Sequence, residues 1–197
     1  MDGKNATIRL IEALEAAQVA YMLVGSLSSN YHGIARATKD ADIVVSASNS
    51  DLHQALRHLS PELQMDRQMT FETATGTTRH IVAVQGSPFR IELFRLSNDP
   101  HDQERFQRRR RVFDLALERE VFIATAEDVV VMKLRWALNA ARNKDRDDAR
   151  DVIGVCGDNL DWDYLHKWTD LHGTRTLLKE ILASLPPSKI RQTTENS

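Results

Sequence analysis

Two acidic side chains are spaced so that they could bind a divalent cation. Asp40 and Asp42 flank Ala41 in a short apolar segment. On a strand, residues two apart point to the same face, so both carboxylates would project together. Adjacent carboxylates repel each other unless a cation lies between them. Mg²⁺ prefers oxygen ligands and completes its octahedron with water and substrate phosphate. The spacing therefore predicts a magnesium site, with a solvated strand end as the alternative.

A third carboxylate, Glu92, lies in the alternating segment 89–94. Ile91 and Leu93 would point to one face of a strand and Glu92 to the other. A charge in an interior strand is costly without a partner. Glu92 therefore either completes a three-carboxylate metal site or forms a salt bridge with a nearby arginine.

Gly25 and Ser26 end one apolar segment and begin the next element. A Gly-Ser elbow between a strand and a helix leaves small side chains and backbone N–H groups where a phosphate chain can approach. A lone glycine at a strand end is usually a simple turn. The combination of strand, elbow, short helix and a second strand bearing Asp40 and Asp42 is far more specific.

Lys133 is predicted to lie on the apolar face of a helix, and it therefore needs an anionic partner. Asp145 and Asp148 share one face of the next helix. These three residues form either a buried ion pair that fixes helix packing or a phosphate-binding lysine oriented by an acid. The opposite, solvated face of the lysine helix is predicted to carry Asp128, Arg135, Asn139 and Arg142.

The elements that position these residues follow from hydrophobic periodicity and from turn residues. Strands are predicted at 20–24, 38–45, 77–84 and 89–94, with a hairpin around Glu118 within 112–123. Helices are predicted at 7–17, 27–31, 51–59, 125–140 and 144–155, with a capping box of Thr125 and Asp128. A further helix follows the cap Asp161, and a last one begins at Thr174.

This order of elements predicts an α/β (α+β) fold, in which a mixed sheet flanked by helices is followed by a C-terminal helical bundle. The predicted α/β core comprises residues 1–124, and a helical region packed on it comprises residues 125–185. Residues 186–197 are predicted to form a flexible tail.

Composition restricts the class of protein. The chain has 197 residues, is 42% hydrophobic and 27% charged, and carries a formal net charge of −2. The apolar runs are too short for a membrane span, and the amino terminus lacks a signal-peptide layout. The one cysteine, Cys156, excludes an internal disulfide framework and a cysteine-built zinc site. We expect a cytoplasmic protein with no membrane partner.

Four consecutive arginines, Arg108 to Arg111, form the clearest basic cluster in a chain that is acidic overall. They could contact the phosphates of an RNA acceptor, or they could be a solvated loop or helix end. Arg36 and Arg90 flank the acidic strands, and either could bind phosphate or serve as a structural counter-ion.

The chemistry-bearing residues together resemble a known family. Gly25-Ser26, a short helix and Asp40-Ala41-Asp42 resemble the signature of the nucleotidyltransferase superfamily that includes DNA polymerase beta. Lys133 and the D-x-x-D pair Asp145 and Asp148 add the motifs of a narrower group. More narrowly, the chain resembles the AbiEii-type nucleotidyltransferases, the toxins of type IV toxin–antitoxin systems. The run from Arg36 to Asp42 matches the R-x-T-x-D-x-D variant of that group.

The resemblance implies an NTP-dependent transferase that uses Mg²⁺ or Mn²⁺. Asp40, Asp42 and Glu92 would be catalytic metal ligands, and Lys133 would be a further catalytic residue that neutralises developing charge. The nucleotide-binding residues implied are Gly25, Ser26, Lys133, Asp145 and Asp148. A nucleoside monophosphate would pass to a hydroxyl on RNA (tRNA among the candidates) or on protein, and an antitoxin protein would be a partner.

Two other function classes remain open from the sequence. A catalytically silent module of the same fold would bind nucleotide or a partner without turnover, although it has no need for so many acids. A metal-dependent nuclease could use the three carboxylates, but it would not require the Gly-Ser elbow.

Overall fold

The computed structural model describes residues 1–57, 59, 61–66, 68–72, 76–140 and 143–186. The chain forms two compact units. The first consists of Met1–Leu27 and Ala37–Ala124, and the second of Ser28–Arg36 and Thr125–Ser197. Residues 187–197 of the predicted tail (186–197) and the predicted position of Arg142 lie outside the described residues.

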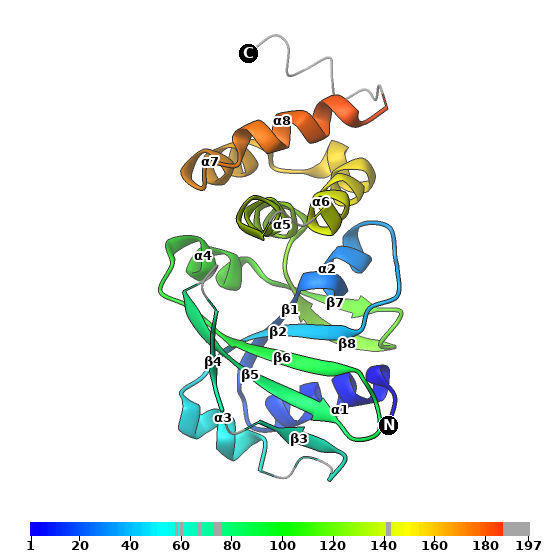
Figure 1. Cartoon of the computed structure of the whole chain (residues 1–197), viewed down its shortest axis with the longest axis vertical. Coiled ribbons are helices and arrows are strands. Elements are labelled where there is room, and N and C mark those ends of the chain that lie inside the picture. The colour runs from blue at the N-terminus through cyan, green and yellow to red at the C-terminus, as the bar shows by residue number, and fades with distance from the viewer. Residues whose placement is uncertain (58, 60, 67, 73–75, 141–142, 187–197) are drawn as a thin grey trace. The chain divides into compact units, whose positions relative to one another are not determined.

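The first unit is built on an eight-stranded mixed sheet (Figure 1). The strand order is β3-β5-β6-β2-β1-β8-β7, and β4 pairs with β5. The strands are β1 (Ala20–Val24), β2 (Asp40–Ser46), β3 (Leu63–Met65), β4 (Thr70–Glu72), β5 (Thr77–Val84), β6 (Arg90–Arg95), β7 (Arg110–Asp114) and β8 (Arg119–Ile123). β2 runs parallel to β6 and β1 parallel to β8, while the other pairs are antiparallel. The predicted mixed α/β class is confirmed.

One face of the sheet is covered by helices α1 (Gly3–Ala16) and α3 (Asn49–Ala55), as Figure 1 shows. The apolar stripe of α1, including Leu10, Ile11 and Leu14, packs in one core with Ala41, Ile43 and Val45 of β2. Because side chains alternate along a strand, burial of Ala41 and Ile43 against the helices directs Asp40 and Asp42 to the opposite face. The hydrophobic pattern of β2 thus positions its acids.

The predicted strands agree closely with the structure. β1 and β5 have the predicted bounds, and β6 is shifted by one residue from the predicted 89–94. The predicted hairpin at 112–123 is formed by β7 and β8, and Glu118 in its turn has a φ of 54°. The short strands β3 and β4 were not predicted.

Helix α4 (Pro100–Arg108) was also not predicted from periodicity, because charged residues occupy its buried positions. Asp99 caps it by accepting hydrogen bonds from the backbone N–H groups of His101 and Asp102. Asp102 is buried and accepts hydrogen bonds from Ser97 Oγ and, at 2.7 Å, from Arg105 Nε. An ion pair within the helix thus compensates two of the charges that α4 buries.

The second unit is helical in its described residues. It contains the later part of α2 (Gly25–His32), α5 (Ala126–Ala140), α6 (Asn143–Cys156), the 3₁₀ turn η1 (Gly157–Asn159), α7 (Trp162–Leu171) and α8 (Arg175–Ser184). The predicted capping contact of Thr125 and Asp128 is formed: Thr125 Oγ1 accepts a 3.4 Å hydrogen bond from the Asp128 backbone N–H and donates one of 2.8 Å to Asp128 Oδ2. Asp161 caps α7 as predicted, whereas Thr174 precedes α8 without a side-chain capping hydrogen bond.

One predicted position in the second unit is wrong. Asp128 was placed on the solvated face of α5, but it is fully buried and accepts a 2.6 Å hydrogen bond from the hydroxyl of Tyr164. Helix α7 covers this part of α5, so the capping acid is enclosed rather than solvated. None of the helices in the described residues combines the length and apolar character needed to cross a membrane.

Candidate active site

Asp40 and Asp42 project from β2 on the sheet face opposite α1, and both are partly buried. Asp40 lies at the start of the strand, where its Oδ1 accepts a 2.8 Å hydrogen bond from Thr38 Oγ1. The same hydroxyl lies 2.9 Å from the backbone oxygen of Asp40. Thr38 therefore fixes both the strand entry and the orientation of the first carboxylate.

Gly25 forms the elbow between β1 and α2, and it lies against the second carboxylate. Val24 is directly paired with Asp42 in the antiparallel register of β1 and β2. Gly25 has a φ of +58°, and a Cβ added there would lie 1.9 Å from Asp42 Oδ2. Only glycine meets both conditions, because a side chain would be strained and would overlap the carboxylate. Ser26, the next residue, is buried at the start of α2.

Glu92 of β6 is the direct neighbour of Asp42 in the parallel register of β2 and β6, and Arg90 is the neighbour of Asp40. Neighbouring strands lie about 4.8 Å apart, so the side chains of Asp42 and Glu92 start side by side on one face. The Oε2 atom of Glu92 accepts a 2.5 Å hydrogen bond from Nη1 of Arg79 on β5. The guanidinium of Arg79 also lies 6.0 Å from the centre of the Phe94 ring.

The donor set of these three acids consists of oxygen atoms, which suits Mg²⁺ or Mn²⁺. Within the described parts of the chain, no three His, Cys, Asp or Glu side chains converge as a ready-made metal site. Asp40 and Asp42 fit a cation that takes its remaining ligands from phosphate and water. Glu92 forms the salt bridge that was the alternative to metal binding, and Arg79 is its partner.

Lys133 lies in the second unit, buried on α5, and it bridges two acids of α6. Its Nζ atom is 2.9 Å from Asp145 Oδ1 and 2.7 Å from Asp148 Oδ2. All three side chains are at most 8% exposed. The lysine on the apolar face of α5 and the two acids on the facing side of α6 thus meet as predicted, and they form a buried ion-pair cluster.

Arg36 completes this cluster from the segment that follows α2. Its Nε donates to Asp148 Oδ1 at 3.0 Å and its Nη2 donates to Asp148 Oδ2 at 2.9 Å. Burial opposes ionisation of Asp148, but the hydrogen bonds from Arg36 and Lys133 outweigh it and lower the pKa of this carboxyl. Arg36 is thus a counter-ion of Asp148 on α6, whereas the sequence had suggested a counter-ion of the acids on the strands.

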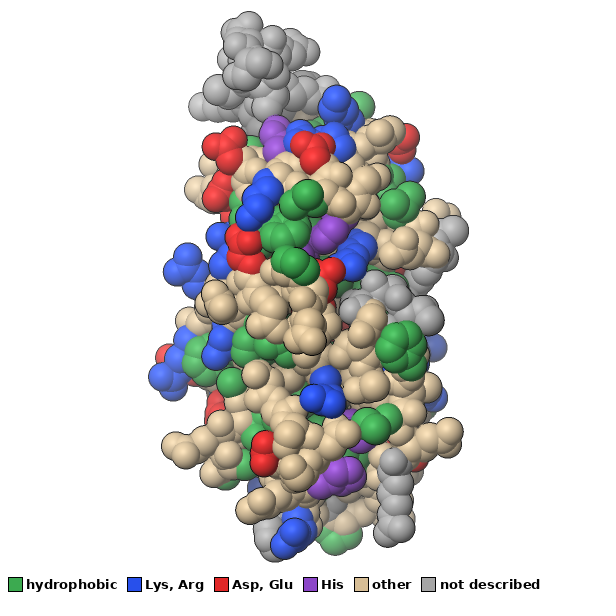
Figure 2. Space-filling model, turned by 90° about the vertical axis from the view of Figure 1, so that its left-hand side faces the viewer, with side chains coloured by type: hydrophobic (Ala, Val, Ile, Leu, Met, Phe, Trp, Pro, Cys, Tyr) green, Lys and Arg blue, Asp and Glu red, His purple; other side chains and the backbone are tan. Residues whose placement is uncertain are grey.

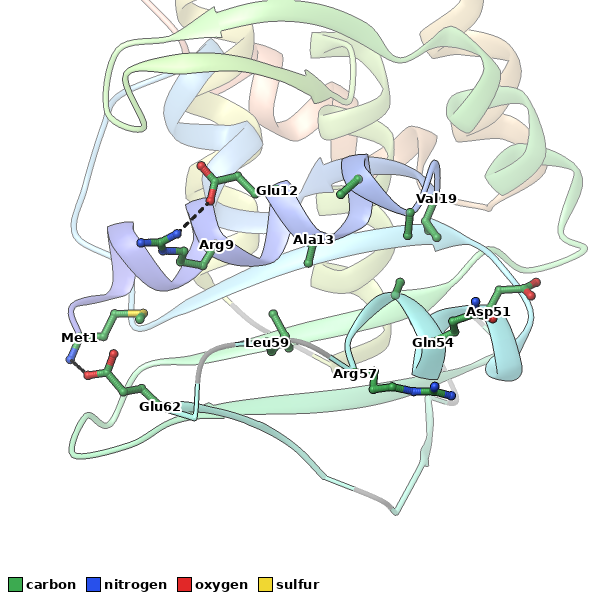
Figure 3. A pocket seen from close by; sticks show the side chains of 13 residues that line it. Met1, Arg9, Glu12, Ala13, Val19, Asp51, Gln54, Arg57, Leu59 and Glu62 are labelled. Atoms are coloured by element: carbon green, nitrogen blue, oxygen red, sulfur yellow. Dashed lines mark hydrogen bonds and ion pairs between the residues drawn. The ribbon is translucent and has the colours of Figure 1, made fainter.

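A separate hollow of about 900 Å³ lies between α1, α3, Leu59 and Glu62 of the first unit (Figure 3). Arg9, Glu12, Asp51 and Arg57 line it together with small apolar side chains. It is on the helix-covered side of the sheet, whereas Asp40 and Asp42 project from the other side. None of the predicted site residues lines this hollow.

The protein is a nucleotidyltransferase, an NTP-dependent enzyme. Its mixed sheet, with a glycine turn in contact with the D-x-D carboxylates of β2, agrees with this class. Residues 22–155 match the family model described as nucleotidyl transferase AbiEii toxin, type IV TA system. The chain therefore belongs to the AbiEii nucleotidyltransferase toxin family. Among curated proteins no match was found.

Solved structures share the fold at low sequence identity. The antibiotic-resistance factor ANT(2″)-Ia in solution is 9% identical, with a TM-score of 0.60 over 90% of this chain and 94% of that chain. An antigenic nucleotidyltransferase-like protein from Paracoccidioides brasiliensis is 17% identical, with a TM-score of 0.54 over 93% and 94%. JHP933 from Helicobacter pylori is 13% identical, with a TM-score of 0.53 over 97% and 82%.

Proposed function

We propose that this protein transfers a nucleoside monophosphate from a nucleoside triphosphate to an acceptor hydroxyl, with a divalent metal ion as cofactor. The carrying observation is the contact between the Gly25 backbone and the Asp42 carboxylate. This contact brings a backbone turn suited to phosphate next to a carboxylate suited to a cation. A metal–triphosphate presents both of these chemical groups.

The carboxylates of Asp40 and Asp42 are assigned to Mg²⁺ or Mn²⁺. When bound, the ion would neutralise phosphate charge and stabilise the leaving oxygen. Thr38 supports this role because its hydroxyl holds the Asp40 carboxylate in place. The backbone at Gly25 and Ser26 is assigned to the outer phosphates, since α2 begins there and a helix N-terminus attracts anions.

Glu92 is assigned to activation of the acceptor hydroxyl. As the register neighbour of Asp42, it is suited to accept the proton of the attacking hydroxyl or to serve as a further metal ligand. The ion pair with the guanidinium of Arg79 fixes the orientation of the Glu92 carboxylate. Metal binding by Glu92 would use Oε1, since Arg79 donates its hydrogen bond to Oε2.

Lys133, Asp145 and Asp148 are assigned to nucleotide binding on the basis of the family resemblance. Asp145 and Asp148 each hold one side of the lysine ammonium, which has three N–H donors. Arg36 supplies the second positive charge that balances the two acids. Without this balance, two buried carboxylates would neutralise the lysine and weaken its attraction for phosphate.

The transfer forms a bond between the acceptor oxygen and the α-phosphorus while the bond to pyrophosphate breaks. The proton of the hydroxyl passes to a base, for which Glu92 is the candidate. We propose RNA or protein as the source of the hydroxyl, and the family adds an antitoxin protein as a proposed partner. ANT(2″)-Ia was crystallised with adenylyl-2″-tobramycin, a nucleotidylated small molecule, but this chain is only 10% identical to it.

A catalytically silent nucleotide-binding module is the second candidate. One observation favours it: Glu92 is engaged by Arg79, and Lys133 is engaged by two acids. In such a module these ion pairs would persist when nucleotide binds, and no transfer would follow.

The deciding experiment supplies the purified protein with Mg²⁺ and each α-labelled nucleoside triphosphate. Parallel reactions contain total tRNA, a protein extract or no acceptor. Label transfer that is lost in Asp42→Asn and kept in Asp51→Asn, an exposed control on α3, supports the transferase. Nucleotide binding without transfer in any acceptor pool favours the silent module. Shortened RNA without labelled product would indicate a nuclease instead.

A further inference from the structure

The arginine run between α4 and β7 has a defined arrangement that the proposed chemistry leaves unused. Along β7 the side chains alternate, and Val112 is paired with Val121 on the side that packs against the core. Arg111 and Phe113 therefore point to the opposite side of the sheet. We call the side chains of Arg109, Arg111 and Phe113 on this side the β7 face.

Arg109 is fixed between two aromatic rings. Its guanidinium carbon lies 4.3 Å from the centre of the Phe106 ring on α4 and 5.2 Å from that of Phe122 on β8. Its Nη1 atom also donates a 2.6 Å hydrogen bond to the backbone oxygen of Phe106. Cation–π contacts hold the side chain without neutralising its charge, so Arg109 contributes a stationary positive charge to the β7 face.

Arg111 and Phe113 are the accessible members of the face. The side chain of Arg111 is 63% exposed and forms a 2.7 Å ion pair with Glu120, which is 56% exposed. Such an exposed pair contributes little, so a phosphate can replace Glu120 at small cost. Phe113 is 55% exposed and is the register neighbour of Glu120 on β8. An aromatic ring thus lies in solvent beside an arginine on an edge strand.

The β7 face is on the same side of the sheet as Asp42 and Glu92. Val24 is beside Asp42 in the register and points to the same side of the sheet, so Leu23 points to the other side. Ile123 is beside Leu23, and Phe122, the residue before it, therefore points to the side of Asp42. Phe122 is in turn the neighbour of Arg111. β7 is three strands from β2 in the sheet order, which corresponds to about 14 Å.

The arginine run is a local concentration of positive charge. The chain carries a formal net charge of −2, yet four arginines follow one another at residues 108–111. On the face of the molecule seen in Figure 2, positive and negative side chains are interspersed and gather into no patch of one sign. A polyanion therefore has a specific electrostatic reason to bind at the arginine run.

We propose that the β7 face binds a single-stranded segment of an RNA acceptor, an inference that rests on the proposed nucleotidyl transfer. The guanidinium of Arg111 binds a backbone phosphate in place of Glu120, and Arg109 adds its fixed charge. The Phe113 ring stacks on a base of the same segment. Alternating arginine and an exposed aromatic ring suit a strand of phosphates and unstacked bases better than they suit a folded protein surface.

The test measures binding of a short fluorescent single-stranded RNA to the full chain by anisotropy, without nucleotide and over a series of salt concentrations. Phe113→Ala is expected to weaken binding by about 5- to 100-fold because it removes stacking. Phe71→Ala, which removes an equally exposed phenylalanine from β4, is the matched control and should leave binding unchanged. Circular dichroism of each variant checks that the fold is kept.

Two charge variants make the prediction sharper. Arg111→Gln is expected to lower the slope of log binding constant against log salt by about 0.7, the value for one phosphate contact to a single strand. Glu120→Gln removes the competing carboxylate and is expected to tighten binding by about 1.5- to 5-fold. Arg9→Gln, an exposed arginine on α1, is the control for a change of net charge.

Several outcomes would overturn the proposal. If the Phe113 and Phe71 variants bind RNA with equal affinity, the β7 face does not bind RNA. Equal salt slopes of the Arg111 and Arg9 variants would lead to the same conclusion. If the wild type binds no RNA but transfers label to protein, the acceptor is a protein and the proposal is wrong. Failure of the proposed transfer is distinguishable, because the wild type would then label no acceptor, whereas RNA binding is measured independently of transfer.

Discussion

The backbone of Gly25 is in direct contact with the carboxylate of Asp42: a Cβ added to the glycine would lie 1.9 Å from Oδ2. The contact joins two strands that are antiparallel neighbours in the sheet, and it therefore depends on the β1–β2 register as well as on the local turn. It explains why a glycine precedes Ser26 at this elbow.

Replacement of Gly25 by alanine is expected to abolish nucleotide binding and to destabilise the protein. The φ of +58° costs an alanine roughly 1–2 kcal/mol, and the Asp42 carboxylate must move as well. Gly86→Ala is the matched control, because Gly86 has a φ of +73° but no atom within 4 Å of an added Cβ. Urea denaturation and nucleotide titration of both variants measure the difference. Equal losses in both would show that Asp42 does not constrain residue 25.

Replacement of Lys133 by methionine is expected to lower the free energy of unfolding by about 3–5 kcal/mol, because it leaves two buried carboxylates with less compensation. Urea denaturation measures this loss. The double variant Lys133→Met/Asp145→Asn should recover part of it, since one buried charge is removed and Arg36 still pairs with Asp148. If the double variant regains stability but not nucleotide binding, while Asp145→Asn alone still binds nucleotide, Lys133 has the proposed phosphate role. Recovery of both would limit Lys133 to a structural role.

The stability of the protein is expected to fall as the pH drops below about 6.5, the ordinary pKa of histidine. Burial lowers the pKa of His80, and the nearby His53 and Arg95 act in the same direction. A folded-state pKa below the unfolded value means that the unfolded chain binds the proton first, so stability is present above pH 6.5 and is lost below it. Urea denaturation at pH 7.5 and 5.5 measures this slope.

His80→Leu is expected to flatten that slope without removing it. The pKa of His166 is also lowered, mainly by burial, and this second contribution remains in the variant. An unchanged slope in His80→Leu would assign the pH dependence to other groups.

Several parts of the candidate site could be predicted from the sequence because they depend on local rules. Strand alternation places Asp40 and Asp42 on one face, and helical spacing places Asp145 and Asp148 together. The approach of Lys133 to these acids follows from the need of a buried cation for an anion. Each of these inferences requires only the regular direction of side chains along one helix or strand, and the free-energy cost of burying a charge.

Other features depend on the pairing of distant segments, which the sequence does not encode locally. Nothing within residues 77–84 indicates that Arg79 would meet Glu92, because that contact depends on the register of β5 and β6. Helix α4 was missed because Asp102 and Arg105 are buried by pairing with each other. Its one local signal was Asp99 followed by Pro100, a cap and a first-turn proline.

The burial of Asp128 is another feature that depends on a distant segment. Its sequence position correctly predicted the capping box with Thr125, but not its burial. The hydroxyl of Tyr164, 36 residues further along, provides the hydrogen bond that makes burial acceptable. Periodicity shows which face of a helix a residue occupies, whereas the packing of a later helix decides whether that face is solvated.

Calorimetric titration of nucleoside triphosphate into the protein, with and without Mg²⁺, tests the metal–nucleotide site most directly. Each of the four common triphosphates is titrated into the wild type, Asp42→Asn and the Asp51→Asn control. We predict Mg²⁺-dependent binding of at least one nucleotide to the wild type and the control, and its loss in Asp42→Asn. Binding that is equally tight in Asp42→Asn, or that does not depend on Mg²⁺ in the wild type, would contradict the assignment of Asp40 and Asp42 as metal ligands.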